Sequence, residues 1–156
     1  PVHTNDAPGA ITRLVDMGVE PFLVASSLVG SLAQRLVRTL CRHCREPYRP
    51  TPEELAEVGI TPEIMEKHGT GVLMRPKGCP ECNGLGYKGR TGIYEMMLVD
   101  DEIRQMILRN VDSNTIKKHA IAKGMMALRE HGAVKVARGV TSATEVLRVV
   151  QDDVVL

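Results

Sequence analysis

The sequence contains no tryptophan and very few aromatic residues of any kind. Its 156 residues include one phenylalanine and three tyrosines, namely Phe22, Tyr48, Tyr87 and Tyr94. Proteins that hold single-stranded nucleic acid usually stack its bases on several aromatic rings. The composition therefore argues against such a platform and predicts a core of aliphatic side chains and methionine.

A strong net charge and a long apolar run are also missing. Twenty basic and nineteen acidic residues leave a formal charge of +1, which would attract neither nucleic acid nor an anionic membrane. No run of eighteen apolar residues occurs, and the first residues lack the pattern of a secretory signal. We expect a soluble protein that is not exported and has no nucleic-acid partner.

The chain does contain enough apolar material for a real core. Apolar residues make up 43% of it, which predicts one compact domain, or one domain with a small appendage. The sequence starts at Pro1-Val2-His3-Thr4 without an initiator methionine, within what reads as structured sequence. We therefore expect a fragment of a longer protein.

Capping residues and apolar periodicity predict a mainly helical chain. A first helix should begin after Asn5 or Asp6 and end near Gly18, and a second should begin near Pro21 with an apolar stripe as far as Leu32. Further helices are expected at about 52–58 and 62–68, after Asp100 or Asp101, and at about 114–123, 126–138 and 143–151. Strands are expected at 34–40 and 93–99. The predicted fold class is α+β, predominantly helical.

Two of these helices carry a capping box in the sequence. Thr51 is followed by Pro52 and, three residues after the cap, by Glu54, so each side chain can accept a hydrogen bond from the other residue's backbone N–H. Ser142 and Glu145 have the same spacing before the last predicted helix. Both pairs predict a helix that starts at a defined residue.

The four cysteines form two C-x2-C pairs, Cys41 with Cys44 and Cys79 with Cys82, and 34 residues separate the pairs. Two ligands from each of two tight turns make the tetrahedral thiolate shell that zinc accepts. All four cysteines are used, so no position stays open for a catalytic water. We predict a structural zinc site, in a two-knuckle subdomain inserted between helical segments.

Other uses of these thiols are less compatible with the sequence. Disulfides are disfavoured because the chain shows no export signal and a reducing cytosol favours metal. A redox pair is disfavoured because neither C-x2-C opens a helix after a strand. A four-thiolate iron centre uses the same ligands and stays open. His43, inside the first pair, is interpreted as a solvated turn residue because Cys44 already completes that pair.

The glycine-rich segment around the second pair has little intrinsic order, so metal binding should supply its folding free energy. Structural zinc binds zinc-finger peptides with roughly 10–16 kcal/mol. We therefore expect that removing the metal unfolds residues 41–92 and leaves the four C-terminal helices largely intact.

Several unconnected motifs occur in order along the chain. They are HTNDAPGA at 3–10, GVEPF at 18–22, LAQRLVR at 32–38, GCPECNGLGYKGRTGIYE at 78–95, GVTS at 139–142 and Glu145-Val146. In this order, over essentially the whole chain, they resemble the secretion ATPases that power type II secretion and type IV pilus assembly. The GVEPF motif leans toward the type II secretion branch.

This resemblance implies a larger protein, a cytoplasmic homohexamer that lies peripheral to the inner membrane. It would bind ATP and Mg²⁺ and use hydrolysis to assemble a pseudopilus or pilus. Its partners would be its own neighbouring subunits and the inner-membrane platform and cytoplasmic-domain proteins of the secretion system.

The resemblance also assigns ranges and residues. Residues 1–40 would be the C-terminal remnant of a RecA-like ATPase domain, 41–92 the tetracysteine metal-binding subdomain, and 93–156 a C-terminal strand plus helical subdomain. His3 and Thr4 would belong to the His box near the nucleotide phosphates. Gln34 and Arg35 would lie close to the nucleotide-binding lobe.

The chain departs from the full enzyme because it has no G-x4-G-K-[ST] loop to hold the β- and γ-phosphates. We therefore expect the fragment to lack ATPase activity and to act as a zinc-stabilised coupling and interaction module. A free-standing zinc module is the alternative. Cys79–Gly86 is similar to the zinc repeats of certain heat-shock chaperones, and a nucleic-acid-binding zinc ribbon would use Lys88 and Arg90.

Overall fold

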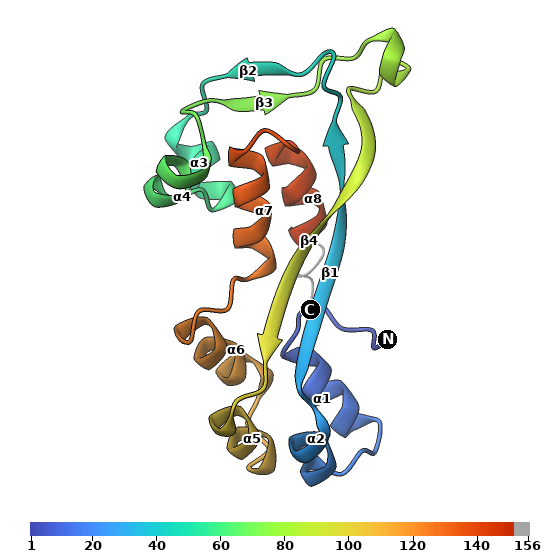
Figure 1. Ribbon diagram of the computed structural model, residues 1–156, viewed down its shortest axis with the longest axis vertical. Helices are drawn as coiled ribbons and strands as arrows, with labels where there is room; N and C mark the ends of the chain where they lie inside the picture. The colour runs from blue at the N-terminus through green and yellow to red at the C-terminus, as the bar shows by residue number, and fades with distance from the viewer. Residues whose placement is uncertain (152–156) are drawn as a thin grey trace. The chain divides into compact units, whose positions relative to one another are not determined.

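Two long strands pair with one another in opposite directions (Figure 1). They are β1 (Gly30–Leu40) and β4 (Tyr87–Leu98), and together they form a two-stranded sheet. The computed structural model describes residues 1–151, so the last five residues of the predicted 93–156 range lie outside the described residues. Among the described helices, none has the length and apolar character that crossing a bilayer requires.

Packing divides the chain into two compact units that each take part of both strands. Among the described residues, unit 1 comprises 1–34 and 94–127, and unit 2 comprises 35–93 and 128–151. The boundaries at 34/35 and 93/94 fall within β1 and β4, so each strand begins in one unit and ends in the other. The three ranges expected from sequence, 1–40, 41–92 and 93–156, were assigned by resemblance to a family and not by packing, and they stay a prediction.

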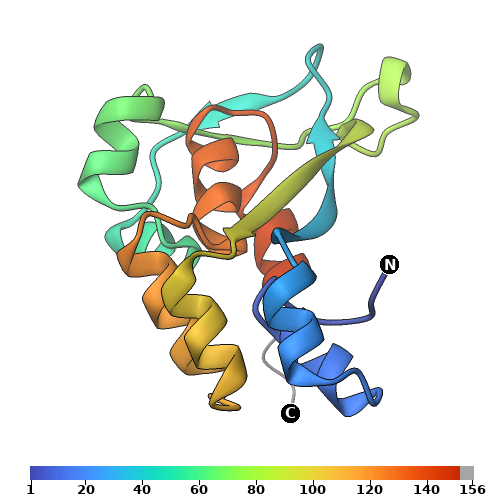
Figure 2. The ribbon, with the colours of Figure 1, turned by 60° about the horizontal axis from the view of Figure 1, so that its bottom comes forward.

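Unit 1 places four helices around the shared strand ends. These are α1 (Gly9–Asp16), α2 (Pro21–Ser27), α5 (Asp101–Leu108) and α6 (Ser113–Ala122). Helix α2 packs on α5 and α1, and α6 packs on α1 and α5. Helices α5 and α6 lie side by side in both views (Figures 1 and 2). The buried apolar side chains include Ile11, Val24, Ala33, Met97, Ile103, Ile107 and Ile116.

A fully buried carboxylate lies inside unit 1. Glu95, on β4, is 0% exposed and accepts the backbone N–H of Ala7 (3.0 Å). The ammonium of Lys117 on α6 lies 3.5 Å from this carboxylate and 3.0 Å from that of Asp6. Because a buried charge is tolerated only when it is paired, these contacts fix the segment before α1 against β4 and α6.

Unit 2 combines a short two-stranded sheet with four helices. The strands β2 (Glu46–Tyr48) and β3 (Leu73–Arg75) pair antiparallel, with Pro47 opposite Met74. The helices are α3 (Pro52–Val58), α4 (Pro62–His68), α7 (Leu128–Ala137) and α8 (Ala143–Gln151), and η1 (Pro80–Cys82) is a single 3-10 turn. Helix α7 contacts α3, α4, α8 and β3, and α3 also contacts α8.

Unit 2 also contains a buried glutamate, Glu145 on α8, whose side chain is 1% exposed. Its carboxylate accepts the backbone N–H of Arg38 (3.0 Å), both Nε (3.1 Å) and Nη2 (3.0 Å) of that side chain, and Nη2 of Arg148 (2.7 Å). Burial opposes ionisation, but the hydrogen bonds from Arg148 and Arg38 outweigh it and lower the pKa of Glu145 to about 2. The Arg38 guanidinium also stacks over the ring of Tyr87, 4.2 Å from its centre.

The predicted helices are confirmed where local signals define them. Helices α3 and α4 begin and end as expected, and the capping box is present: Glu54 N–H donates to Thr51 Oγ1 (3.2 Å) and Thr51 N–H donates to Glu54 (2.9 Å). Asp100 caps α5 as expected and accepts the N–H of Ile103 (2.7 Å). Helix α1 begins later than expected, with Pro8 as its cap residue, and Asp6 accepts the N–H of Gly9 (2.9 Å) from before the cap. The mixed, mainly helical fold class is confirmed as well.

Other expectations were wrong in detail. The apolar stripe expected on the second helix does not continue, because α2 ends at Ser27 and the chain is extended from Gly30, leaving Leu32 59% exposed. At the second predicted capping box, Glu145 N–H donates to Ser142 Oγ (3.2 Å), but the Glu145 carboxylate binds the two arginines instead of returning the bond. The strands β2 and β3 were missed.

The Glu145 network predicts a pH-dependent stability. Its pKa is lowered from 4.5 to about 2, so the carboxylate stabilises the fold above pH 4.5 and this contribution is lost as the pH falls toward 2. Glu145→Gln should lower the free energy of unfolding by roughly 2 kcal/mol at pH 7. The difference from the wild type should shrink between pH 4.5 and 2, as measured by denaturant titrations.

Glu130→Gln is the matched control, because Glu130 is exposed on α7 in the same unit. It should leave stability within about 0.5 kcal/mol of the wild type. Equal stability of the two variants at pH 7 would show that the arginine network contributes nothing.

Candidate metal centre

The strands β2 and β3 bring the two cysteine pairs together. Cys41 directly follows β1 and Cys44 lies two residues before β2, whereas β3 ends four residues before Cys79. Pairing of Glu46 with Arg75 in the β2–β3 register therefore closes the 34-residue connection at its base. The carboxylate of Glu46 adds ion pairs to Lys77 (2.7 Å) and Arg75 (3.6 Å) at the same place.

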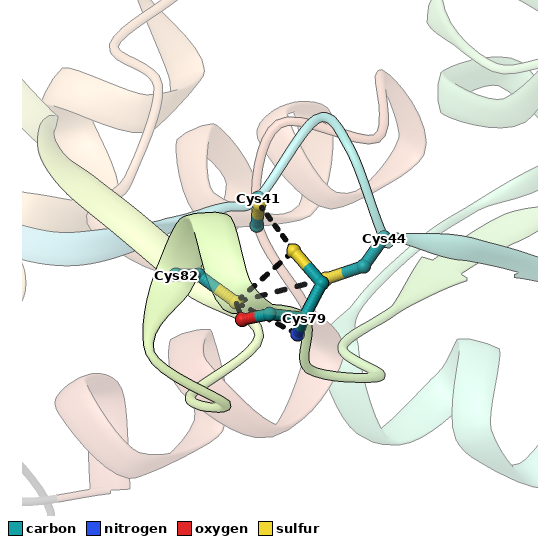
Figure 3. A group of neighbouring side chains, drawn as sticks. All are labelled: Cys41, Cys44, Cys79 and Cys82. Carbon is teal, nitrogen blue, oxygen red and sulfur yellow. Dashed lines mark hydrogen bonds between the residues drawn. The ribbon is translucent and has the colours of Figure 1, made fainter.

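The four sulfur atoms converge on a common centre (Figure 3). The Sγ–Sγ distance is 3.8 Å from Cys41 to Cys79, 3.8 Å from Cys44 to Cys82 and 3.7 Å from Cys79 to Cys82. All four lie within 4.8 Å of one another. Sulfurs placed about 2.3 Å from a tetrahedral ion are about 3.8 Å apart, so the cluster has the dimensions of a four-thiolate metal site.

Backbone N–H groups point at the sulfurs as they do toward metal-bound thiolates. Cys82 Sγ accepts from the N–H of Gly86 (3.1 Å) and of Cys79 (3.3 Å), and Cys44 Sγ accepts from the N–H of Gly78 (3.3 Å). A second link joins the two knuckles, since the Cys41 N–H donates to the Gly86 carbonyl (2.9 Å). These bonds orient the sulfurs toward the centre of the cluster.

The pKa values of the two thiols in the second pair shift in opposite directions. Burial raises the pKa of Cys79, and hydrogen bonding with the neighbouring sulfurs adds to that rise. Burial also opposes ionisation of Cys82, but the N–H donors of Cys79 and Gly86 outweigh it and lower its pKa. One thiolate is thus favoured while the next is opposed, and a divalent cation at the centre would allow all four to ionise.

Two glycines are required where the knuckles approach other backbone. Gly78 has φ +103°, and a Cβ there would lie 2.6 Å from the Gly84 carbonyl oxygen. Gly86 has φ +79°, and a Cβ there would lie 2.4 Å from Pro76. Both residues are among the N–H donors to sulfur, so the glycines of this segment serve the cluster geometry directly.

The four cysteines suit a metal site in which the protein supplies every ligand. The sulfur separations are far longer than the roughly 2.05 Å of a disulfide, and all four cysteines are free. Cys41, Cys44 and Cys82 are buried, so the site is shielded from solvent on most sides. His43 is exposed and lies outside the group of ligand atoms, as predicted for a turn residue.

The nucleotide-proximal residues expected from the resemblance lie elsewhere in the chain. His3 and Thr4 precede α1, where His3 is exposed and Thr4 Oγ1 donates to the Asp6 carbonyl (2.7 Å). Gln34 and Arg35 are consecutive on β1, at the residues where the two units divide. None of the four belongs to the cysteine cluster, and their proximity to nucleotide stays a prediction.

Sequence reasoning missed the residues that hold the cluster against the last two helices. Arg45 Nη1 donates to the carbonyl of Gly139 (2.6 Å), two residues after α7 ends, and the Leu40 N–H donates to the Val140 carbonyl (2.9 Å). Tyr87, at the start of β4, bonds Ser142 Oγ (2.7 Å) at the start of α8. These partners are about fifty to a hundred residues apart in sequence, so no local pattern signals them.

The chain is similar in sequence to known secretion proteins. A family model described as "Type II/IV secretion system protein" matches residues 1–148. Type II secretion system protein E of Pseudomonas aeruginosa is 48% identical over 152 residues, which cover 97% of this chain and 29% of that protein. Type II secretion system ATPase E of Vibrio cholerae is 46% identical over 151 residues, covering 97% of this chain and 29% of that protein.

A pilus protein is similar to the same degree. The type IV pilus assembly ATPase PilB of Thermus thermophilus is 47% identical over 146 residues, which cover 94% of this chain and 16% of that protein. The chain thus spans less than a third of the length of the curated relatives it matches. Because secretion and pilus proteins match almost equally, the lean toward the secretion branch stays a prediction.

The packing of the last two helices leads to a different expectation for the unfolding that follows metal removal. The sequence alone predicted that all four C-terminal helices would survive, but α7 and α8 pack on α3, α4 and β3 within unit 2. Chelation should therefore speed amide exchange in residues 41–92 and also in α7 and α8, while α5 and α6 of unit 1 keep their protection. Hydrogen exchange followed by mass spectrometry, with and without chelator, measures this directly.

Two outcomes would contradict this expectation. Uniform loss of protection in both units would mean that the metal supports the whole chain. Unchanged exchange in residues 41–92 would mean that the cysteine cluster folds without an ion.

Proposed function

This chain belongs to the family of type II/IV secretion system proteins, and from that premise we propose that it is the C-terminal part of a secretion ATPase. The full protein would act in the cytoplasm, peripheral to the inner membrane, where it powers pseudopilus assembly and protein export. The observation that carries this proposal is the match to such proteins along nearly the whole chain, over less than a third of their own length.

We propose that the resident ion is Zn²⁺ and that Cys41, Cys44, Cys79 and Cys82 are its ligands. The near-tetrahedral sulfur separations support zinc, which takes four thiolates without a geometric penalty. With four protein ligands no position is left for water or substrate. The role is therefore structural, and an iron centre on the same ligands is the competing assignment.

ATP and Mg²⁺ would bind in the longer protein, outside the zinc cluster. This stretch contains no G-x4-G-K-[ST] loop, and we propose that it does not hydrolyse ATP by itself. His3, Thr4, Gln34 and Arg35 would lie near the nucleotide by resemblance to the family. The partners would be neighbouring subunits of a homohexamer and the platform and cytoplasmic-domain proteins of the secretion system, without nucleic acid.

The arrangement supports a role in coupling. The cluster lies where β1 ends and just before β4 begins, so its ion would tie together the two strands that continue into the other unit. Arg45 connects the same region to Gly139, just after α7, and Tyr87 connects it to Ser142, just before α8. A rigid attachment at this point would let a partner move a whole unit rather than a flexible loop.

A free-standing zinc module is supported less well. The likeness to chaperone zinc repeats is confined to residues 79–86, and the basic residues of a nucleic-acid-binding ribbon are Lys88 and Arg90 alone. Lys88 is also paired with Glu81 (3.8 Å) across the second knuckle. The family match, by contrast, covers residues 1–148.

The coupling role predicts a separation of functions in the full-length protein. Cys79→Ser should keep nucleotide binding within about twofold, because the cluster has no part in holding the phosphates, yet it should abolish secretion. His43→Ala is the matched control: the residue is exposed between two ligands and should leave both activities unchanged. Nucleotide affinity and secreted protein would be measured for both variants.

Normal secretion by Cys79→Ser, with the metal shown to be lost, would remove the coupling role. Equal damage from His43→Ala would indicate that the knuckle surface matters rather than the ion.

A further inference from the structure

The two helices between the cysteine pairs enclose an apolar groove of about 720 Å³. Its walls repeat at ten-residue spacing, since Pro52 and Leu55 on α3 correspond to Pro62 and Met65 on α4. Buried Ile60, between the helices, forms part of the floor. We propose that this groove binds an apolar segment of a partner protein that carries flanking lysine or arginine residues. The proposal stands on the groove and does not depend on the coupling role proposed above.

The groove is held open by the rest of unit 2. The helices α3 and α4 both contact α7, and α3 also contacts α8, so their other faces are already occupied. Arg129 on α7 donates to the Ala56 carbonyl (3.3 Å) and to the Glu57 carbonyl, which fixes the end of α3. A preformed groove of this kind binds without the cost of ordering itself.

Few polar groups are available to orient a small polar ligand. Thr61 lines the groove, but its hydroxyl already accepts the N–H of Ile64 (3.3 Å). The remaining lining is aliphatic, proline, methionine or glycine apart from Glu66. Such a surface suits apolar side chains of a peptide segment, which anchor in a groove at helical spacing.

Charge around the groove selects the partner. Residues 51–71 contain five glutamates and one lysine, and Arg129 and Arg138 bond to this segment at Glu57 and His68, so the formal charge around the groove is −2 whereas the chain as a whole carries +1. Glu66 lines the groove itself, and the exposed Glu53 lies one residue after Pro52 and three before Ala56, at the edge of the same helix face. Cationic residues on either side of an apolar anchor would meet these carboxylates, and anionic ones would be repelled.

The probe is a labelled peptide of about 18 residues, made of leucine at helical spacing and lysine elsewhere. The full chain, purified with its metal, should bind it, and nuclear magnetic resonance shifts should map to residues 52–71. Ala56→Phe should weaken binding about tenfold or more by filling the groove, whereas Ala122→Phe, exposed at the end of α6, should not.

Charge is tested separately from shape. Glu53→Gln with Glu66→Gln should weaken binding about fivefold at low salt, the worth of two exposed ion pairs, and the difference should vanish near about 0.5 M salt. The matched control is Asp16→Asn with Glu20→Gln, which removes two exposed charges from the other unit. A peptide with glutamate replacing lysine should not bind.

Several outcomes would overturn the proposal. Shifts outside 52–71, or full affinity of Ala56→Phe, would place the peptide elsewhere. Equal binding of the glutamate peptide would remove the basic partner. A dimer of the chain that Ala56→Phe converts to monomer, seen by sedimentation, would identify a second copy as the occupant instead.

Discussion

The structure of unit 2 depends on four sulfur atoms that come from two distant turns and share one centre. The connection between the turns is 34 residues long, and two three-residue strands and the bond from the Cys41 N–H to the Gly86 carbonyl close it through the backbone. Strands this short contribute little by themselves. Binding an ion by roughly 10–16 kcal/mol would release more free energy than the unfolding of many whole domains costs. Metal binding would therefore contribute far more than the β2–β3 pairing to holding this base closed.

The cluster is continuous with the rest of its unit through polar contacts rather than a large core. Arg45 reaches the end of α7, and Tyr87 reaches the start of α8 while its ring lies under Arg38. Arg38 in turn holds Glu145, the buried carboxylate of the unit. With few aromatic residues to fill space, charged networks of this kind fix the orientation of helices that aliphatic packing would leave less defined.

The parts of the fold that sequence could predict are those with local causes. Thr51 and Glu54 bond to one another and so determine where α3 begins. The C-x2-C spacing predicts metal binding without any knowledge of where the two turns lie in the fold. The strand β2 was missed because it has three residues and contains Pro47, and the first half of β4 because Lys88 to Gly92 are polar and glycine-rich. Pairing with β1 overrides that composition. The role of Glu145 depends on Arg38, 107 residues away, which no periodicity reveals.

We propose that one metal ion with four sulfur ligands joins the two knuckles. X-ray absorption at the metal edge of the purified chain measures both the element and its neighbours. We predict a zinc edge with four sulfur atoms at about 2.3 Å and no nitrogen or oxygen ligand. Fewer than four sulfurs, a mixed shell, or an iron edge would contradict this account.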